Sequence, residues 1–287
     1  MSPKDLFLHL RLHWQVMLSP LFLWGFLLSG AQTGLRFWVV FFIFHVLFYG
    51  GATALNSYYD RDEGPIGGLW NPPQVTRDLQ VFSVAMQVIG LVLIFFISLP
   101  LLGLSLVMGA VGNAYSHPAI RLKSRPWSSL LSVSIFQGMG GTAAGWLCGA
   151  EDWTTLLSLK AMLAMLSASL VITGFYPLTQ IYQREQDRRR GDITFAVHWG
   201  ERCFPLAITC FICAAVLMGG LIWRYFGLGE ALIMVSGLIA LAALIALWWR
   251  RYDDSHVRAN YLRMMGVGYV MTGGFLGFIG WQLVQGL

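Results

Sequence analysis

The chain has 287 residues, of which 56% are hydrophobic and only 11% are charged, and its formal net charge is +5 at pH 7. This apolar fraction exceeds what a soluble core of this size would bury, which excludes a soluble globular domain. Since no segment between the apolar stretches is long enough to form a nucleic-acid-binding domain, we expect a polytopic integral membrane protein without a nucleic-acid partner.

Nine apolar stretches are long enough to span a bilayer, at about 20 residues per span. They lie at roughly 13–31, 37–56, 81–98, 99–116, 129–150, 155–180, 204–223, 231–249 and 264–285. The opening residues 1–12 have neither a compact basic start nor a small-residue cleavage site, so we expect a cytosolic interfacial segment. The expected fold is a single all-α transmembrane domain over 1–287. Four spans with two polar loops occur twice, as a weak repeat, before a ninth span.

The Lys and Arg residues are divided unevenly between the two sides of this bundle. The side opposite the N-terminus receives only Arg36, Lys160 and Arg224 of the 19 Lys and Arg residues. Because cytoplasmic loops are enriched in Lys and Arg, we expect the N-terminus and the long polar loops in the cytoplasm and the C-terminus on the opposite side.

The first long polar loop follows the second apolar stretch and begins with NSYYDRDEGPIGGLWNPP. Asn56 and Asp60 are four residues apart and therefore stack on one helix face, and Asp62 and Glu63 follow directly. The helix is expected to break at the next Gly-Pro pair. Oxygen ligands thus gather at one helix end, although a helix end that is merely solvated by headgroups has the same composition.

Two histidines lie close to the polar loops in the sequence. His45 precedes Asn56 by 11 residues, about three helical turns, so we expect both side chains on one face. His45 is then either a buried helix–helix hydrogen-bonding residue or a functional group, which contacts an acceptor substrate or handles a proton. His117 either stabilises its own loop or contacts the acceptor.

A second polar stretch, YPLTQIYQREQDRRRGDITFAVHWG, follows the sixth apolar stretch. Gln180, Gln183 and Asp187 fall at i, i+3 and i+7 and form one helical stripe. Arg184 and Arg188 stack beside this stripe. The chain therefore carries two polar helix ends, four spans apart, on the same expected side.

The loop between these two stretches, YSHPAIRLKSRPW, supplies Arg121, Lys123 and Arg125 on that side. Carboxylates alone repel a diphosphate, whereas Mg²⁺ held by one or two carboxylates and by phosphate oxygens turns the repulsion into attraction. Arg and Lys neutralise the remaining charge. The pattern predicts Mg²⁺ and a ligand with a polyanionic head and an apolar tail, such as a prenyl diphosphate. Tyr182 is then either an interfacial aromatic residue or a π face that stabilises an allylic cation.

These motifs resemble those of the UbiA superfamily of intramembrane prenyltransferases, over nearly the whole chain. The matching residues are Asn56, Tyr59, Asp60 and Arg61 in the first motif, Tyr115, Ser116, Pro118, Arg121 and Lys123 in the central loop, and Glu185, Asp187, Arg188, Gly191 and Thr194 in the second motif. The resemblance implies nine helices, Mg²⁺ and transfer of an isoprenyl chain. It leaves the acceptor open among aromatic acids, quinone precursors, tetrapyrroles, carotenoids and glycerolipids.

Four positions depart from the superfamily pattern. Ser57 and Gly64 stand where the first motif has Asp, and Gln180 and Gln183 replace acids of the second motif. We expect the RDEGPIGG loop to fold back, so that Asp62 or its acidic neighbour replaces the missing ligand. The Gly residues permit such a turn because they adopt positive φ at little cost.

The hypothesis is a Mg²⁺-dependent transfer of an isoprenyl chain from a prenyl diphosphate to a lipophilic acceptor within the membrane. The alternatives are a UbiA-like terpene cyclase and a non-catalytic lipid-binding or carrier protein that retains the fold. The expected catalytic residues are Asp60, Asp187, Lys123 and Arg125. The expected substrate-binding residues are Asn56, Arg61, Tyr115, Arg121, Tyr182, Arg184, Arg188, His117 and His45. The expected metal ligands are Asn56, Asp60, Asp62, Glu63, Gln183 and Asp187.

Overall fold

The computed structural model describes residues 1–62 and 64–285, which are almost entirely helical. The only strand-like pairing within these residues is an isolated antiparallel bridge between Ile66 and Leu69. The expectation that Glu63 is a metal ligand falls outside the described residues. The expected all-α fold is confirmed for the described part of the chain.

The first half of the chain forms helices up to residue 150. They are α1 (Pro3–His9), α2 (Leu12–Ser29), α3 (Leu35–Phe42), η1 (Ile43–Phe48), α4 (Tyr49–Asp60), α5 (Arg77–Ile97), α6 (Leu99–Ser116), η2 (Leu122–Ser124), α7 (Pro126–Ser132), η3 (Val133–Met139) and α8 (Gly140–Ala150). The segments η1 and η3 are π-helical and continue the helices on either side of them.

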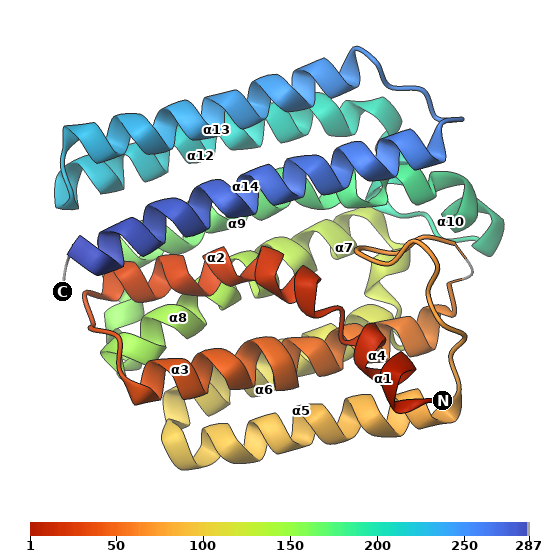
Figure 1. Ribbon diagram of the computed structural model, residues 1–287, viewed down its shortest axis with the longest axis horizontal. Helices are drawn as coiled ribbons and strands as arrows, with labels where there is room; N and C mark the ends of the chain where they lie inside the picture. Colours follow the sequence, from red (N-terminus) through yellow and green to blue (C-terminus); the bar gives the residue numbers. More distant parts are fainter. Residues whose placement is uncertain (63, 286–287) are drawn as a thin grey trace.

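The second half contains four long helices together with several short helical segments. They are η4 (Trp153–Leu157), α9 (Leu159–Gln180), η5 (Ile181–Gln183), α10 (Arg184–Arg190), α11 (Phe195–Trp199), η6 (Gly200–Arg202), α12 (Cys203–Tyr225), α13 (Leu228–Trp249) and α14 (Val257–Gln285). The long helices lie side by side in Figure 1, whereas α1, α10 and the loop over residues 64–76 gather toward one end of the bundle. The N-terminus lies on the side of that end, and helix α14 ends at the opposite end (Figure 1).

Eight helical stretches are long and apolar enough to cross a membrane. They are Pro3–Ser29, Leu35–Asp60, Arg77–Ile97, Leu99–Ser116, Leu159–Arg190, Phe195–Tyr225, Leu228–Trp249 and Val257–Gln285. Their outer faces carry large exposed apolar side chains, such as Phe96 with 78% and Val216 with 69% of its surface exposed. A soluble protein rarely exposes so much contiguous apolar surface, so lipid is the environment that these faces fit. The protein is an integral, polytopic membrane protein.

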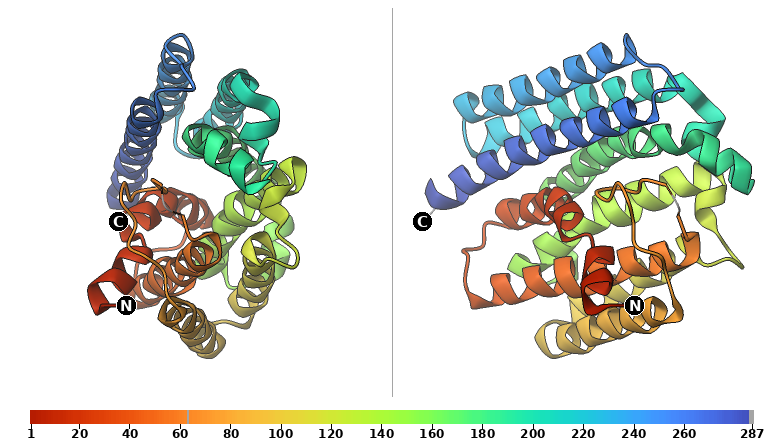
Figure 2. Two further views of the ribbon diagram at one scale, coloured as in Figure 1. Left: turned by 90° about the vertical axis from the view of Figure 1, so that its right-hand side faces the viewer. Right: turned by 45° about the vertical axis from the view of Figure 1, so that its right-hand side comes forward.

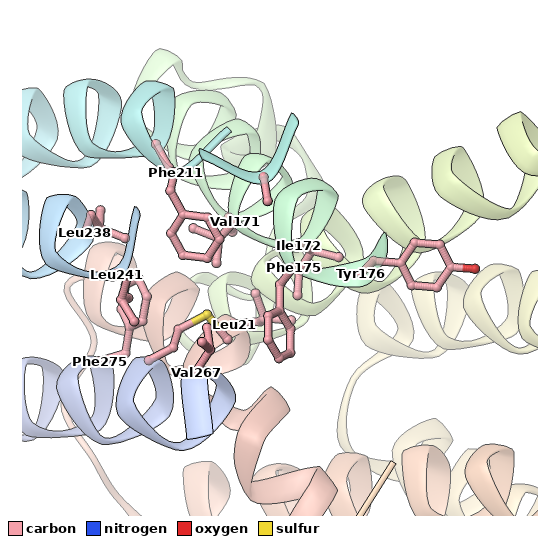
Figure 3. Packing of buried hydrophobic residues seen from close by; sticks show 14 of the residues in the cluster. Leu21, Val171, Ile172, Phe175, Tyr176, Phe211, Leu238, Leu241, Val267 and Phe275 are labelled. Atoms are coloured by element: carbon pink, nitrogen blue, oxygen red, sulfur yellow. The ribbon is translucent and has the colours of Figure 1, made fainter. Parts of the chain in front are cut away.

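The largest apolar core lies where α2, α9, α12, α13 and α14 meet. Figure 3 shows Phe211 of α12, Leu241 of α13 and Phe275 of α14 facing one another beside Val171 of α9. Tyr176 belongs to the same cluster, but its hydroxyl points away from these residues (Figure 3). At one end of the core, the Tyr176 hydroxyl therefore faces another part of the bundle.

Two glycines allow α2 and α8 to pack with their backbones almost in contact. A Cβ atom on Gly145 would lie 1.8 Å from the carbonyl oxygen of Phe22, and one on Gly25 would lie 1.9 Å from that of Thr142. Small residues permit this close approach in membrane helices, where van der Waals packing drives association. The contact fixes α2 against α8 within the first half of the bundle.

Candidate functional site

A cavity of about 330 Å³ lies between the two halves of the bundle and reaches the end that carries the polar loops. Its polar lining includes Arg11, Thr53, Asn56, Asp60, Asp62, Ser116, Lys123, Gln180, Gln183, Asp187, Arg190, Asp192 and Thr194. Its apolar lining includes Met17, Leu18, Phe48, Met108, Phe136, Ile172, Phe175 and Met271. The cavity thus joins a charged mouth to an apolar interior, and we refer to it as the pocket.

The first polar loop places two carboxylates in the pocket. Helix α4 ends at Asp60, and Arg61 has the left-handed backbone conformation, with φ 48°, that turns the chain there. Asp60 forms an ion pair with Lys123, and Asp62 forms one with Arg190 at 2.5 Å. Because the turn at Arg61 directs the chain back, Asp62 lines the pocket as the sequence predicts.

The second polar loop contributes an acid that is held differently. Helix α9 tightens into the 3₁₀ turn η5 before α10 begins at Arg184. This places Asp187 at the pocket, where one of its carboxylate oxygens accepts a hydrogen bond from the Thr194 hydroxyl at 3.1 Å. The amide nitrogen of Gln183 donates to the carbonyl oxygen of Pro65 at 2.9 Å. The two polar loops are therefore in direct contact beside the pocket.

Arg121 ties the central loop to the second polar loop. Its guanidinium donates two hydrogen bonds to Asp192, at 2.8 and 2.7 Å, in the forked geometry that Arg forms with carboxylates. This hydrogen bonding raises the pKa of Arg121. Burial alone would raise the pKa of Asp192, but the hydrogen bonds and charge of Arg121 lower it below its usual value. The pair holds Lys123, two residues away, beside Asp60.

Tyrosine hydroxyls and side-chain amides form a chain across the pocket wall. The hydroxyls of Tyr115 and Tyr176 lie 2.6 Å apart, and the amide nitrogen of Gln180 donates to Tyr176 at 2.7 Å. On the other side, the amide nitrogen of Asn56 donates to the Ser116 hydroxyl at 2.7 Å. This bond fixes the Asn56 amide and leaves its carbonyl oxygen as an acceptor at the pocket.

The loop over residues 64–76 lies over the start of α2 and contributes Ile66 and Gly67 to the pocket lining. A Cβ atom on Gly67 would lie 3.0 Å from the Trp14 ring, and Gly68 has φ 87° beside His13. Only glycine fits these two positions without strain or displacement of the rings. The left view of Figure 2 looks onto this end of the bundle, with the loop crossing in front of the helices.

Several predicted site residues do not line the pocket. Arg125 and His117 are exposed, and His117 packs edge-on against Tyr59. Arg61 lies outside the pocket lining, with its guanidinium 5.8 Å from the Tyr58 ring centroid. Each of these three residues lies directly after a helical segment, at the C-terminal cap of α4, α6 and η2.

Arg184 and Arg188 are also placed differently from the prediction. Arg184 donates to Tyr252 at 3.0 Å and forms an ion pair with Asp254 at 3.1 Å. Arg188 lies 3.9 Å from the same Asp254 carboxylate. The break at η5 turns the two arginines toward the loop before α14, whereas Tyr182, within η5, does line the pocket.

His45 does not share the Asn56 face, contrary to expectation. It lies in the π-helical segment η1, whose wider turn shifts its angular position relative to an α-helix of the same length. Its ring stacks on Phe41 with centroids 4.1 Å apart, and its Nδ1 lies 2.9 Å from the Phe41 carbonyl oxygen. His45 is thus buried among aromatic rings and lies outside the pocket lining.

Three charged pocket residues were not singled out from the sequence. Arg190 and Asp192 belong to the second polar stretch, but their pairing with Asp62 and Arg121 joins segments that are far apart in the chain. Arg11 precedes the first apolar stretch and looks like an interfacial anchor, yet it is buried and lines the pocket. The sequence did contain a signal for Arg11, because the residue is expected on the same side of the membrane as the acidic loops.

The oxygen atoms of the pocket can be compared with the ligands that Mg²⁺ uses. Within residues 1–62 and 64–285, no three His, Cys, Asp or Glu side chains are close enough together to hold a metal ion by themselves. Protein-bound Mg²⁺ typically uses only one or two carboxylates and completes its shell with waters and substrate phosphates. The acids of both loops and the carbonyl oxygen of Asn56 supply such oxygens in one pocket, so the donor set fits Mg²⁺.

Comparisons with known proteins agree with this fold. The chain is 27% identical over 256 residues to a protoheme IX farnesyltransferase from Pyrobaculum arsenaticum, covering 85% of this chain and 87% of that protein. It is 25% identical over 272 residues to a digeranylgeranylglyceryl phosphate synthase from Methanothrix thermoacetophila, covering 92% and 95%. A solved UbiA homologue from Archaeoglobus fulgidus, bound to GPP and Mg²⁺, has the same fold, with a TM-score of 0.70, 17% identity and 96% and 99% coverage.

The extent of the sequence match establishes the family to which the chain belongs. The sequence model of the UbiA prenyltransferase family matches residues 18–268, which includes both polar loops and the central loop. The resemblance of the motifs to that family is thereby confirmed. This polytopic membrane protein belongs to the UbiA prenyltransferase family.

Proposed function

We propose that the protein transfers an isoprenyl chain from a prenyl diphosphate to a lipophilic acceptor within the membrane, in a reaction that requires Mg²⁺. The observation that carries this proposal is the composition of the pocket, whose charged mouth combines acids of both polar loops with Lys123. The interior is apolar and suits a hydrocarbon tail. A diphosphate head and an isoprenyl tail match these two parts.

The residues that would hold Mg²⁺ are those that present oxygens to the charged mouth: Asn56, Asp60, Asp62, Gln183 and Asp187. When bound there, Mg²⁺ would neutralise the diphosphate and stabilise the charge that it acquires on departure. The amide nitrogens of Gln183 and Asn56 donate hydrogen bonds to Pro65 and Ser116, respectively. Their carbonyl oxygens would therefore be the atoms that bind Mg²⁺.

The basic residues of the pocket act on the leaving group. When the bond between the allylic carbon and the diphosphate oxygen breaks, its electron pair leaves with the diphosphate. Lys123 and Arg190 supply positive charge at the mouth of the pocket, where that negative charge develops. Both are held by carboxylates, Asp60 and Asp62, so their side chains are positioned before the substrate binds.

The interior of the pocket receives the tail and excludes water from the allylic cation. Beyond Met17, Ile172 and Met271 lies a second apolar cavity of about 20 Å³, lined by the same three residues. The tail therefore runs inward between α2, α9 and α14. The aromatic rings of Tyr115 and Tyr176, at the junction of the two parts, offer π faces to the cation.

We extend the proposal to topology. The helical residues 126–150, formed by α7, η3 and α8, make a ninth crossing, and 1–287 form one domain with two pseudo-repeated halves. The end that carries the pocket mouth and α1 faces the cytoplasm, because Arg36, Lys160 and Arg224 are the only Lys and Arg assigned to the other side. Helix α14 ends at the opposite end of the bundle in Figure 1, and the proposal accordingly assigns the C-terminus to that other side.

The proposed acceptor is a haem or an isoprenyl glyceryl phosphate. These two classes come from the names of the relatives, which specify a protohaem and a prenylated glyceryl phosphate. Purified protein is incubated with geranyl or longer prenyl diphosphates, Mg²⁺ and either protohaem or an isoprenyl glyceryl phosphate. We expect a prenylated product and stoichiometric diphosphate, both lost when EDTA removes the metal. No metal-dependent consumption of any prenyl diphosphate would overturn the proposal, and a cyclic hydrocarbon without acceptor would support the cyclase alternative.

A further inference from the structure

Arg11 differs from the other basic residues that line the pocket. Lys123 is paired with Asp60, and Arg190 is paired with Asp62. Arg11 forms no ion pair within the described residues, although it lines the same pocket. It is therefore the basic residue of the pocket that no described acid holds in a direct ion pair, although Asp60 and Asp62 lie near enough to act on its charge.

The Arg11 guanidinium is buried and only partly satisfied. The residue has 9% of its surface exposed, and its Nη2 donates to the carbonyl oxygen of Thr53 at 3.2 Å. The Nε atom is buried without a hydrogen-bond partner within the described residues. A buried charge is strongly unfavourable unless it is paired and hydrogen-bonded, so this arrangement favours an anionic partner.

The backbone holds Arg11 in a conformation that a non-glycine residue adopts at a cost. Arg11 has φ 48° and ψ 51°, in the left-handed region, directly before α2 begins. The side chain of Gln15 donates to the Leu10 carbonyl oxygen at 3.0 Å and to the Thr53 hydroxyl at 2.9 Å, which ties this turn to α4. Strained residues that the surroundings hold in place cluster at ligand sites.

We propose that Arg11 binds an anionic oxygen group of a substrate in the pocket, namely a phosphate or carboxylate. The group belongs either to the diphosphate of the donor or to an anionic acceptor. Since Arg can donate from two nitrogens to one such group, the bound anion satisfies the buried guanidinium. This inference rests on the proposed function only in taking the pocket as the substrate site.

The test measures anion binding directly and needs no turnover. Purified protein is titrated with inorganic phosphate, and separately with pyrophosphate and Mg²⁺, while its thermal unfolding is followed. Arg11→Gly removes the guanidinium and also relieves the left-handed backbone, so this variant is expected to fold. We expect the dissociation constant of at least one probe to rise about 10- to 100-fold, as for the loss of a charged hydrogen bond.

Three further variants separate the effect of the charge from an effect on folding. Arg11→Lys keeps the charge but not the forked geometry, and it is expected to retain part of the affinity. Arg189→Gln removes an exposed arginine that pairs with Glu185, and Glu151→Gly relieves another left-handed residue near the opposite end of the bundle. Both controls are expected to bind the probes as the wild type does.

The two probes distinguish the two sources of the anion. A loss confined to pyrophosphate with Mg²⁺ assigns Arg11 to the donor, whereas a loss confined to phosphate without metal assigns it to the acceptor. Unchanged affinity for both probes in Arg11→Gly and Arg11→Lys would overturn the inference. The result is independent of the proposed reaction, because a protein that turns over no prenyl diphosphate still reports whether Arg11 binds the anion.

Discussion

The two polar loops differ in how they hold their acids. In the first loop, Asp60 and Asp62 are each paired with a basic residue from elsewhere in the chain. In the second loop, Asp187 accepts a hydrogen bond from the Thr194 hydroxyl at 3.1 Å and has no basic partner within the described residues. The first loop thus presents carboxylates in direct ion pairs, whereas the second presents one that forms no ion pair with a base within the described residues.

This difference assigns different tasks to the two loops. A carboxylate that is paired with Lys or Arg has to exchange that partner before it can bind a cation, and the base it releases becomes available to an anion. A carboxylate held by a hydroxyl alone binds a cation without such an exchange. Metal affinity should therefore depend most on Asp187, and the response to the diphosphate should depend most on the pairs of the first loop.

The largest effect is expected from Asp187→Asn. The substitution preserves the hydrogen bond with Thr194 but removes the charge, so turnover should fall by about 100-fold or more. Steady-state rates measured over a range of Mg²⁺ concentrations test this expectation. Glu201→Gln, an exposed acid near the same end, is the control. A rate within twofold of the wild type at all Mg²⁺ concentrations contradicts the role given to Asp187.

Lys123→Met should have the next largest effect and should act on the donor. The pocket loses a cation that faces the diphosphate, so the KM for the prenyl diphosphate should rise about 10-fold or more. Arg125→Ala should have a smaller effect, because Arg125 is exposed and lies outside the pocket lining. Measuring KM for donor and acceptor separately distinguishes the two. Equal effects of the two substitutions would mean that the pairing of Lys123 with Asp60 has no bearing on the substrate.

Asp62→Asn should have an intermediate effect on the metal. Asp62 lines the pocket but is paired with Arg190, so the Mg²⁺ concentration for half-maximal rate should rise only about threefold. Gly64→Asp should partly reverse the change, because a Cβ atom there meets only the Gln186 side chain, at 3.1 Å. An unchanged Mg²⁺ dependence in Asp62→Asn would identify this loop as structural.

The smallest effect on turnover is expected from Asp192→Asn, which acts on stability. Removing the charge leaves Arg121 without its forked partner and should lower the free energy of unfolding by about 3 kcal/mol. Because the folded pKa of Asp192 lies below its usual 3.8, this stabilisation is present above that pH and is lost as the pH falls through the folded value. Thermal unfolding near pH 3 should therefore differ less between variant and wild type than at pH 7. An equal difference at both pH values contradicts the pairing.

Much of the fold and part of the site follow from the sequence. Long apolar stretches determine a helical membrane protein because the bilayer leaves no other partner for backbone groups. Asp60, Asp62, Lys123 and Asp187 lie at one pocket, as expected from polar helix ends on one side of the bundle. These predictions succeed because the helical periodicity of a segment and the membrane side of a loop depend on the local sequence alone.

The remaining features depend on backbone changes that composition does not reveal. The π-helical turn of η1 moves His45 away from the Asn56 face, and the 3₁₀ turn η5 directs Arg184 toward Asp254. Arg11 enters the pocket because the chain takes a left-handed turn just before α2. Such local deviations rotate the side chains that follow, so their consequences are visible only in the folded chain.

The central claim is that acids from both polar loops hold one metal-dependent diphosphate site. Its most direct test is isothermal titration of geranyl diphosphate, with and without Mg²⁺, into the wild type, Asp60→Asn and Asp187→Asn. The account predicts tight binding to the wild type only with Mg²⁺, and loss of this metal dependence in each variant. Either variant binding geranyl diphosphate with the metal dependence of the wild type would contradict the claim.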